Sequence, residues 1–351
     1  MKSIHELGIE LPIIQAPMAG VQDSALAIAV SNAGGLGSLP SAMLSPDALH
    51  AELTAITSST NKPFNVNFFC HTPPEPDPKR EAAWRDLLRP YYAELALDID
   101  SVANTVPTGP GRTPFSHDYI DVLNRFKPAV VSFHFGLPQP DLLQRVRAMG
   151  AKILSSATTV DEARWLAERG VDAVIAQGLE AGGHRGMFLS NDVTTQVGTL
   201  ALVPQIANAL DVPVIAAGGI ADATGVAAAM ALGAAAVQIG TAYMLCREAT
   251  TSAVHRAALA SNASRHTALT NVFTGRPARG IVNRIVREIG PISSLAPRFP
   301  LATAAILPLR SAAEARGSSD FSPLWSGQNT SGCRDVPAAT LTMELVRGVM
   351  R

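Results

Sequence analysis

The chain alternates short, continuous hydrophobic runs with longer segments of helical pattern, and this alternation repeats about eight times. The hydrophobic runs show no polar–apolar alternation, which is typical of parallel strands buried on both faces. The predicted strands cover residues 12–16, 35–39, 64–69, 129–134, 152–155, 173–177, 212–217 and 236–240.

Helix-capping signals separate these strands. The N-capping residues and the helices they predict are Asp23 before 24–32, Thr159 before 160–169 and Asp222 before 223–232. About eight units of strand and helix in one chain predict a (β/α)8 TIM barrel of the α/β class. A doubly wound open sheet is the alternative, but it should carry G-x-G-x-x-G after its first strand, where this chain has PMAG.

Two segments depart from the alternation. Residues 71–117 follow the third strand, are rich in proline and contain a predicted helix over 79–97. We expect this insertion to lie over the carboxyl ends of the strands as a lid or pocket wall, with a surface decoration as the alternative. We expect residues 251–351 to form a helical C-terminal extension packed on the barrel of residues 1–250.

Composition narrows the possible partners. The 351 residues carry a formal net charge of −1 and no long basic run, which argues against binding to nucleic acid. The 3 cysteines lie far apart, so we expect neither a metal site nor a disulfide framework. No signal-peptide pattern or long apolar span is visible, which predicts a cytoplasmic protein without a membrane partner. The oligomeric state stays open.

The densest group of polar residues and glycines follows the sixth predicted strand, where residues 177–186 read QGLEAGGHRG. Its glycines leave backbone N–H groups free to face an anion. The amide of Gln177 can hydrogen-bond the edge of a cofactor ring such as a flavin. An ordinary glycine-rich turn is the alternative, but such a turn does not usually combine Gln, Glu, His and Arg.

Two further glycine segments follow the seventh and eighth strands. They read AAGGIAD and QIGT. The loops after these two strands commonly bind phosphate in barrels of this kind. Gly218 and Gly219 permit close approach to the backbone, and Thr241 adds a hydroxyl group. Together the two segments predict a cofactor that carries a phosphate.

Three other strand ends carry candidate residues. His134 ends the fourth strand, where the carboxyl rim of a barrel favours an acid–base role over that of a buried core histidine. Met18 offers a rigid apolar edge for an aromatic ring after the first strand. Asn67, near the end of the third strand, is a candidate for a hydrogen bond to the cofactor.

These stretches together resemble the nitronate monooxygenase family, formerly called 2-nitropropane dioxygenases. The matching pieces are QAPMAG at 15–20, NVN at 65–67, SFHFG at 132–136, QGLEAGGHRG at 177–186, AAGGIAD at 216–222 and QIGT at 238–241. The resemblance implies a barrel with a lid, non-covalent FMN and no metal. It also implies oxidation of alkyl nitronates, such as propionate 3-nitronate, by O2 to carbonyl products and nitrite.

By motif position, His134 resembles the catalytic histidine, and His184 would lie near the flavin. The candidate cofactor-binding residues are Met18, Asn67, Gln177, Gly182, Gly183, His184, Gly218, Gly219, Gln238, Ile239, Gly240 and Thr241. In this hypothesis His134 donates a hydrogen bond to a nitronate or takes the α-proton of a neutral nitroalkane.

One stretch departs from the family pattern. Members closest to the nitronate oxidisers tend to line the pocket with tyrosines and a lysine, where this chain has Phe299, Thr303 and Leu307. We therefore expect the pocket to lack a cation for an anionic substrate, which leaves the substrate open. The rival function is an NAD(P)H-dependent flavin reductase acting on a quinone or an enoyl thioester. A third is a flavin-binding sensor or carrier without turnover.

Overall fold

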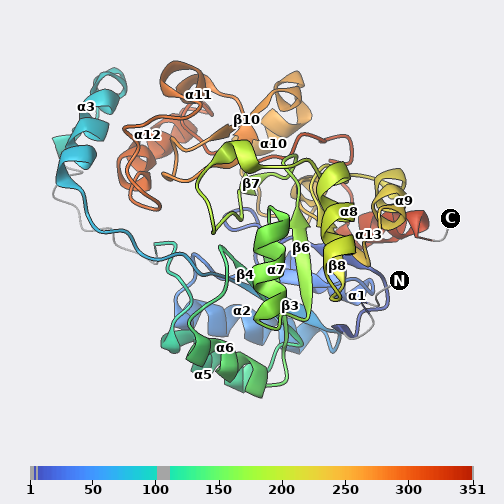
Figure 1. Cartoon of the computed structure of the whole chain (residues 1–351). Coiled ribbons are helices and arrows are strands. Elements are labelled where there is room, and N and C mark those ends of the chain that lie inside the picture. Colours follow the sequence, from blue (N-terminus) through green and yellow to red (C-terminus); the bar gives the residue numbers. More distant parts are fainter. Residues whose placement is uncertain (1–3, 5–6, 101–110, 350–351) are drawn as a thin grey trace.

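The computed structural model describes residue 4 and residues 7–100 and 111–349 (Figure 1). Its centre is a parallel sheet whose strands follow the order β1-β9-β8-β6-β5-β4-β3-β2. These strands are β1 (Ile13–Gln15), β2 (Gly37–Pro40), β3 (Phe64–Phe69), β4 (Val130–His134), β5 (Lys152–Ala157), β6 (Ala173–Gln177), β8 (Val214–Ala217) and β9 (Ala236–Ile239). A parallel bridge between Ile14 and Leu36 joins the two edges. The predicted (β/α)8 barrel is therefore confirmed.

Helices cover the outside of this barrel. They are α1 (Ser24–Asn32), α2 (Pro46–Ser59), α5 (His117–Phe126), α6 (Pro140–Ala148), α7 (Val160–Glu168), α8 (Thr199–Ala209) and α9 (Ala223–Ala231). The predicted N-caps are confirmed, because the side chains of Asp23, Thr159 and Asp222 each accept a hydrogen bond from a backbone N–H in the first turn. Gly233, with a φ of +99°, follows α9 in the left-handed conformation typical of a helix stop.

One helix of the layer around the barrel comes from the end of the chain. Helix α13 (Ala338–Leu345) packs between α1 and α9, and its Leu341 and Leu345 belong to the barrel core. The sequence pattern did not predict this helix, because about a hundred residues separate it from β9. The C-terminal region therefore leaves the barrel and returns to complete it.

A second hydrophobic core lies outside the barrel. It combines α3 (Pro78–Glu94) of the insertion with α12 (Thr303–Ala315) and α11 (Arg284–Ile289) of the C-terminal region, and Figure 1 shows α3 and α12 side by side. Trp84, which is 1% exposed, anchors α3, and its indole N–H donates to the carbonyl of Ala302. Helix α3 confirms the helix predicted over 79–97. Residues 101–110 of the predicted insertion lie outside the described residues.

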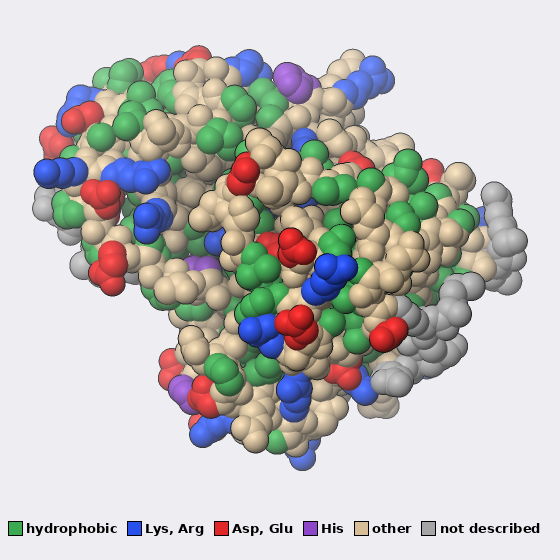
Figure 2. All heavy atoms as spheres, viewed as in Figure 1, with side chains coloured by type: hydrophobic (Ala, Val, Ile, Leu, Met, Phe, Trp, Pro, Cys, Tyr) green, Lys and Arg blue, Asp and Glu red, His purple; other side chains and the backbone are tan. Residues whose placement is uncertain are grey.

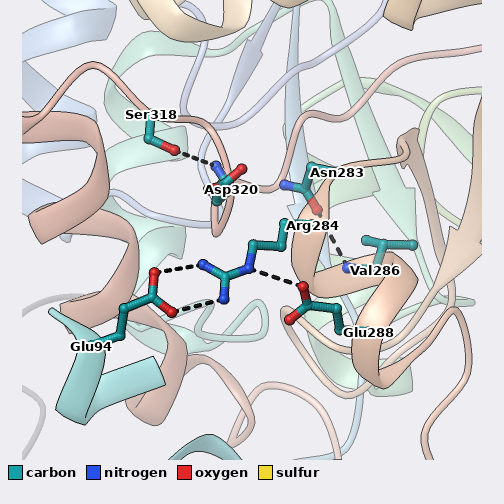
Figure 3. Close-up of polar contacts among 7 residues, drawn as sticks. All are labelled: Glu94, Asn283, Arg284, Val286, Glu288, Ser318 and Asp320. Atoms are coloured by element: carbon teal, nitrogen blue, oxygen red, sulfur yellow. Dashed lines mark hydrogen bonds and ion pairs between the residues drawn. The ribbon is translucent and has the colours of Figure 1, made fainter. Parts of the chain in front are cut away.

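A charged group ties these helices together at their surface (Figure 3). Arg284 of α11 donates to both carboxylate oxygens of Glu94 on α3, each at 2.7 Å, and its Nε lies 3.0 Å from a carboxylate oxygen of Glu288. The insertion and the C-terminal region are thus joined by both a buried apolar contact and an exposed ionic one. On the face shown in Figure 2, basic and acidic side chains are interspersed.

The C-terminal region also contains strands, which the prediction of a helical extension missed. Strands β10 (Thr267–Thr270) and β11 (Ala278–Ile281) pair antiparallel, and β7 (Gly183–His184) adds to the other edge of β11. The register places Ala278 opposite His184. Strands this short form because partners meet in space, so a local pattern does not reveal them. Helix α10 (Ala253–Ala260) precedes β10.

The described part of the chain holds no helix with both the length and the hydropathy needed to cross a bilayer.

Candidate active site

A cavity opens at the carboxyl ends of the barrel strands. Parallel strands that close into a barrel all end at one rim, so segments far apart in the sequence meet there. Every site residue proposed from the sequence lines this cavity: Met18, Asn67, His134, Gln177, Gly182, Gly183, His184, Gly218, Gly219, Gln238, Ile239, Gly240 and Thr241. The structure therefore brings these residues together, while their individual roles remain predictions.

Glycines form one wall of the cavity. Gly218 and Gly219 have φ angles of +122° and +74°, a backbone conformation that favours glycine. A Cβ atom added to Gly240 would stand 3.4 Å from both Ala16 Cβ and Met18 Sδ, which lie at the cavity edge. This wall therefore lets a ligand approach the backbone closely.

The side-chain oxygen of Gln238 is a polar atom without a partner among the described residues. Its Oε1 is buried and accepts no hydrogen bond from the described residues. Buried polar atoms nearly always have a partner, so this oxygen indicates a ligand that donates a hydrogen bond. Asn67 differs, because its Nδ2 donates to Ser132 Oγ at 2.9 Å.

The side-chain amide of Gln177 stabilises the loop that follows it in the chain. Its Nε2 donates to the carbonyl of His184 at 2.9 Å, and its Oε1 accepts from the N–H of Gly186 at 2.7 Å. Arg185, which is 0% exposed, donates to the carbonyls of Gln177 and Gly178, each at 2.7 Å. Arg185 is therefore a scaffold for the loop. The predicted contact of Gln177 with a cofactor ring stays a prediction.

Both ring nitrogens of His134 are bonded within the protein. Nε2 lies 3.2 Å from the carbonyl oxygen of His184, and a carbonyl only accepts, so Nε2 carries the proton. Nδ1 then accepts from the hydroxyl of Ser156 at 3.1 Å. Burial lowers the pKa of His134 to about 3. His134 is thus a neutral imidazole that holds the backbone at His184.

His184 keeps one ring nitrogen unbonded. Its Nε2 lies 2.9 Å from Thr274 Oγ1, and this hydroxyl in turn donates to the carbonyl of Arg276 at 3.4 Å. Thr274 therefore accepts the Nε2 proton, which leaves Nδ1 as an acceptor with no partner among the described residues. Burial holds the pKa of His184 well below its ordinary value, and the positive charge of Arg112 adds to this. The more available base in the cavity is therefore His184.

Aromatic rings surround the two histidines. The ring of Phe299 lies 5.2 Å from that of His184, and Phe135 lies 4.5 Å from His134 between ring centroids. The guanidinium of Arg276 lies 3.9 Å above the ring of Phe135. Aromatic rings and a guanidinium group therefore flank the two histidines.

A cation does line the cavity, so the prediction that the pocket lacks one is wrong. Arg112 of the insertion contributes to the wall, and its Nη1 donates to Thr303 Oγ1 at 3.0 Å. Leu307, at the end of the C-terminal stretch that departs from the family pattern, is 51% exposed. The prediction considered only the C-terminal stretch, whereas the positive charge belongs to Arg112 in the proline-rich insertion. No local pattern marks Arg112, and only the meeting of the two segments reveals it.

The fold and the cavity define a class of protein: a (β/α)8-barrel enzyme with a glycine-lined ligand site at the carboxyl ends of its strands. A family model described as nitronate monooxygenase matches residues 2–348, so the chain belongs to the nitronate monooxygenase family, a family of flavoenzymes.

Relatives with this name match nearly the whole chain. A nitronate monooxygenase of Pseudomonas aeruginosa is 44% identical over 341 residues, which cover 97% of this chain and 96% of the relative. A nitronate monooxygenase of Paraburkholderia phytofirmans is 41% identical over 342 residues, which cover 97% of this chain and 93% of the relative.

Solved structures show the same fold. A nitroalkane oxidase from Streptomyces ansochromogenes superposes with a TM-score of 0.88 at 39% identity, over 97% of this chain and 96% of that one. FabK from Thermotoga maritima gives a TM-score of 0.74 at 28% identity, over 100% of this chain and 96% of the other.

Proposed function

We propose that this protein binds FMN in the cavity and converts alkyl nitronates and O2 to carbonyl products and nitrite. Membership of the nitronate monooxygenase family supports the reaction. The observation that carries the proposal is that the unpartnered Oε1 of Gln238 and the unbonded Nδ1 of His184 belong to residues of one cavity.

The three cysteines are free, which agrees with a cytoplasmic location.

The residues of the cavity fit FMN. Gly218, Gly219 and Gly240 would hold the phosphate through backbone N–H groups, and Thr241 would add a hydroxyl. Gln238 would accept a hydrogen bond from the ring. When bound, FMN supplies the redox chemistry, accepting electrons from the substrate and passing them to O2.

The protein's own residues position the substrate and control its proton. A nitronate has already lost its α-proton, so a neutral His184 can face it without removing one. For a neutral nitroalkane, Nδ1 of His184 is the acceptor available for that proton. His134 acts one step away, because its Nε2 proton holds the carbonyl of His184.

The test is the absorbance of the purified protein, followed by anaerobic titration with propionate 3-nitronate and then NADH. We expect a yellow protein that is bleached by the nitronate and not by NADH. Bleaching by NADH alone would indicate the flavin reductase, and slow reduction by both would indicate a sensor or carrier. A colourless preparation that cannot be reconstituted with FMN would refute the proposal.

Matched variants distinguish the role of His184 from that of His134. His184→Asn should lower turnover of a neutral nitroalkane by about 10²–10⁴-fold, because it removes the accepting Nδ1. It should lower turnover of the preformed nitronate much less. His134→Asn should leave FMN bound and have the smaller effect on the nitroalkane. A larger loss in His134→Asn would instead support the role first predicted for His134.

A further inference from the structure

A short segment of the C-terminal region lines the cavity together with the loops of the barrel. Residues 325–333, which we call the strap, read WSGQNTSGC and contribute Trp325, Gly327 and Asn329 to the cavity wall. No sequence motif marked this segment, because glycine, serine and asparagine are common in ordinary turns. The strap is followed by α13, which lies beside α9 in the helical layer of the barrel (Figure 1).

The strap donates hydrogen bonds to all three glycine segments of the cavity. The bonds run from the N–H of Gln328 to the carbonyl of Glu180 at 3.0 Å, from Asn329 Nδ2 to the carbonyl of Gly219 at 2.9 Å, and from the N–H of Gly327 to Thr241 Oγ1 at 2.9 Å. One short segment therefore holds the loops that follow three different strands of the barrel.

Close packing between the strap and these loops requires glycine on both sides. A Cβ atom added to Gly182 would stand 2.5 Å from the backbone nitrogen of Gly327. One added to Gly332 would overlap the carbonyl oxygen of Ala221. A side chain at either position would force the strap away from the barrel. Gly182 therefore serves the contact with the strap, whatever it contributes to a ligand.

Asn329 fixes the direction of one peptide group in the cavity wall. Its Oδ1 accepts from the N–H of Ser331 at 3.1 Å, so Nδ2 is the atom that donates to the carbonyl of Gly219. In a trans peptide the N–H points opposite to the carbonyl, so the N–H of Ile220 faces away from Asn329. No described residue accepts a hydrogen bond from this N–H. Asn329 therefore leaves a backbone donor of the wall available to an anion.

The strap also determines how the hydroxyl of Thr241 is used. Its Oγ1 accepts from the N–H of Gly327, and its proton has no acceptor among the described residues. A hydroxyl has one proton to donate, and here that proton stays available. Thr241 therefore presents a second donor to a ligand, and both donors belong to residues that line the cavity.

We propose that the strap positions these two donors for the phosphate of FMN, so that docking of residues 325–333 and binding of the phosphate are coupled. The inference rests on the proposed function and adds a segment from outside the barrel loops to the cofactor site. Because coupling is reciprocal, the docked strap should raise the affinity for FMN, and bound FMN should stabilise the docked strap. Riboflavin, which has the same ring without the phosphate, should show neither effect.

The first test compares the two flavins by fluorescence titration of the apoprotein. Asn329→Ala should raise the Kd for FMN by about 5–10-fold, the contribution of one hydrogen bond, and that for riboflavin by less than about twofold. Gln328→Ala removes an exposed side-chain amide from the same strap and is the matched control, which should leave both values unchanged. A strap that only stabilised the fold would weaken both flavins equally in Asn329→Ala.

Hydrogen–deuterium exchange of the wild-type chain gives the reciprocal readout and needs no variant. The N–H groups of Gly327 and Gln328 donate to the barrel loops, so their exchange reports undocking of the strap. Saturating FMN should slow the exchange of a peptide that spans residues 325–333 at least about fivefold relative to saturating riboflavin.

The outcomes separate this inference from the proposed function. The role of the strap is overturned by an unchanged Kd for FMN in Asn329→Ala, by equal weakening of both flavins, or by equal exchange of the strap with either flavin. The proposed function stands in each of these cases. A wild-type chain that binds neither flavin overturns the proposed function and this inference together. If Asn329→Ala does not fold, the exchange of the wild-type strap decides.

Discussion

The hydroxyl of Thr274 determines which nitrogen of His184 carries the proton. Thr274 is 1% exposed and lies between His184 Nε2 and the carbonyl of Arg276. Thr274→Val should therefore lower kcat/KM for a neutral nitroalkane by about 5–10-fold, the contribution of one hydrogen bond. Thr274→Ser keeps the hydroxyl and should recover most of the rate. A purely structural role would instead lower the rate equally with a preformed nitronate, which steady-state kinetics on both substrates would show.

Glycine at position 240 matters for the ligand more than for the fold. Its φ of −110° is accessible to alanine, and the nearest atoms would stand 3.4 Å from an added Cβ. Gly240→Ala should therefore fold with little change in thermal midpoint. The methyl group should raise the Kd for FMN by about tenfold, because a small clash of about 1.4 kcal/mol is enough. Fluorescence titration of apoprotein measures this Kd, and an unchanged value would place the phosphate elsewhere.

At the scale of elements, the insertion is held mainly by its buried face. Trp84→Ala should destabilise the protein by about 3–5 kcal/mol, because it removes a large side chain from the second core. Glu94→Gln breaks only the exposed pair with Arg284 and should leave the unfolding midpoint nearly unchanged. Thermal unfolding and limited proteolysis within α3 compare the two variants. Equal destabilisation would mean that the ionic contact contributes as much as the apolar one to holding the insertion.

For the whole molecule, buried histidines predict a loss of stability in acid. Burial lowers the pKa to about 4 in His71, about 3 in His134 and about 4 in His255, from an ordinary 6.5, and holds that of His184 well below it. Below pH 6.5 the unfolded chain binds protons that the folded chain does not. The free energy of unfolding should therefore fall as the pH falls from about 6.5 towards 4, by at most about 1.4 kcal/mol per pH unit for each histidine.

Urea unfolding of the FMN-loaded protein at pH 7.5 and pH 5 measures this dependence. His255 lies outside the cavity, and its Nε2 contacts the carbonyl of Trp325. His255→Gln should reduce the pH dependence without changing FMN binding. A free energy of unfolding that rises towards pH 5 would contradict the buried, neutral state of these rings.

The sequence predicted the barrel and the meeting of its strand-end residues in one site. Continuous hydrophobic runs indicate parallel strands that are buried on both faces, and Asp23, Thr159 and Asp222 mark the starts of helices through local hydrogen bonds. Once a barrel is predicted, its topology requires all strand ends to meet at one rim. The glycine segments and both histidines could therefore be assigned to one site without coordinates.

The tertiary structure alone decided how that site works. The nitrogen of His184 that stays unbonded depends on Thr274, and the charge in the wall depends on Arg112 meeting Thr303. Helix α13 completes the barrel for a similar reason, since its partners α1 and α9 precede it by more than a hundred residues. Such contacts join segments that are distant along the chain, whereas a sequence pattern reports only the preferences of neighbouring residues.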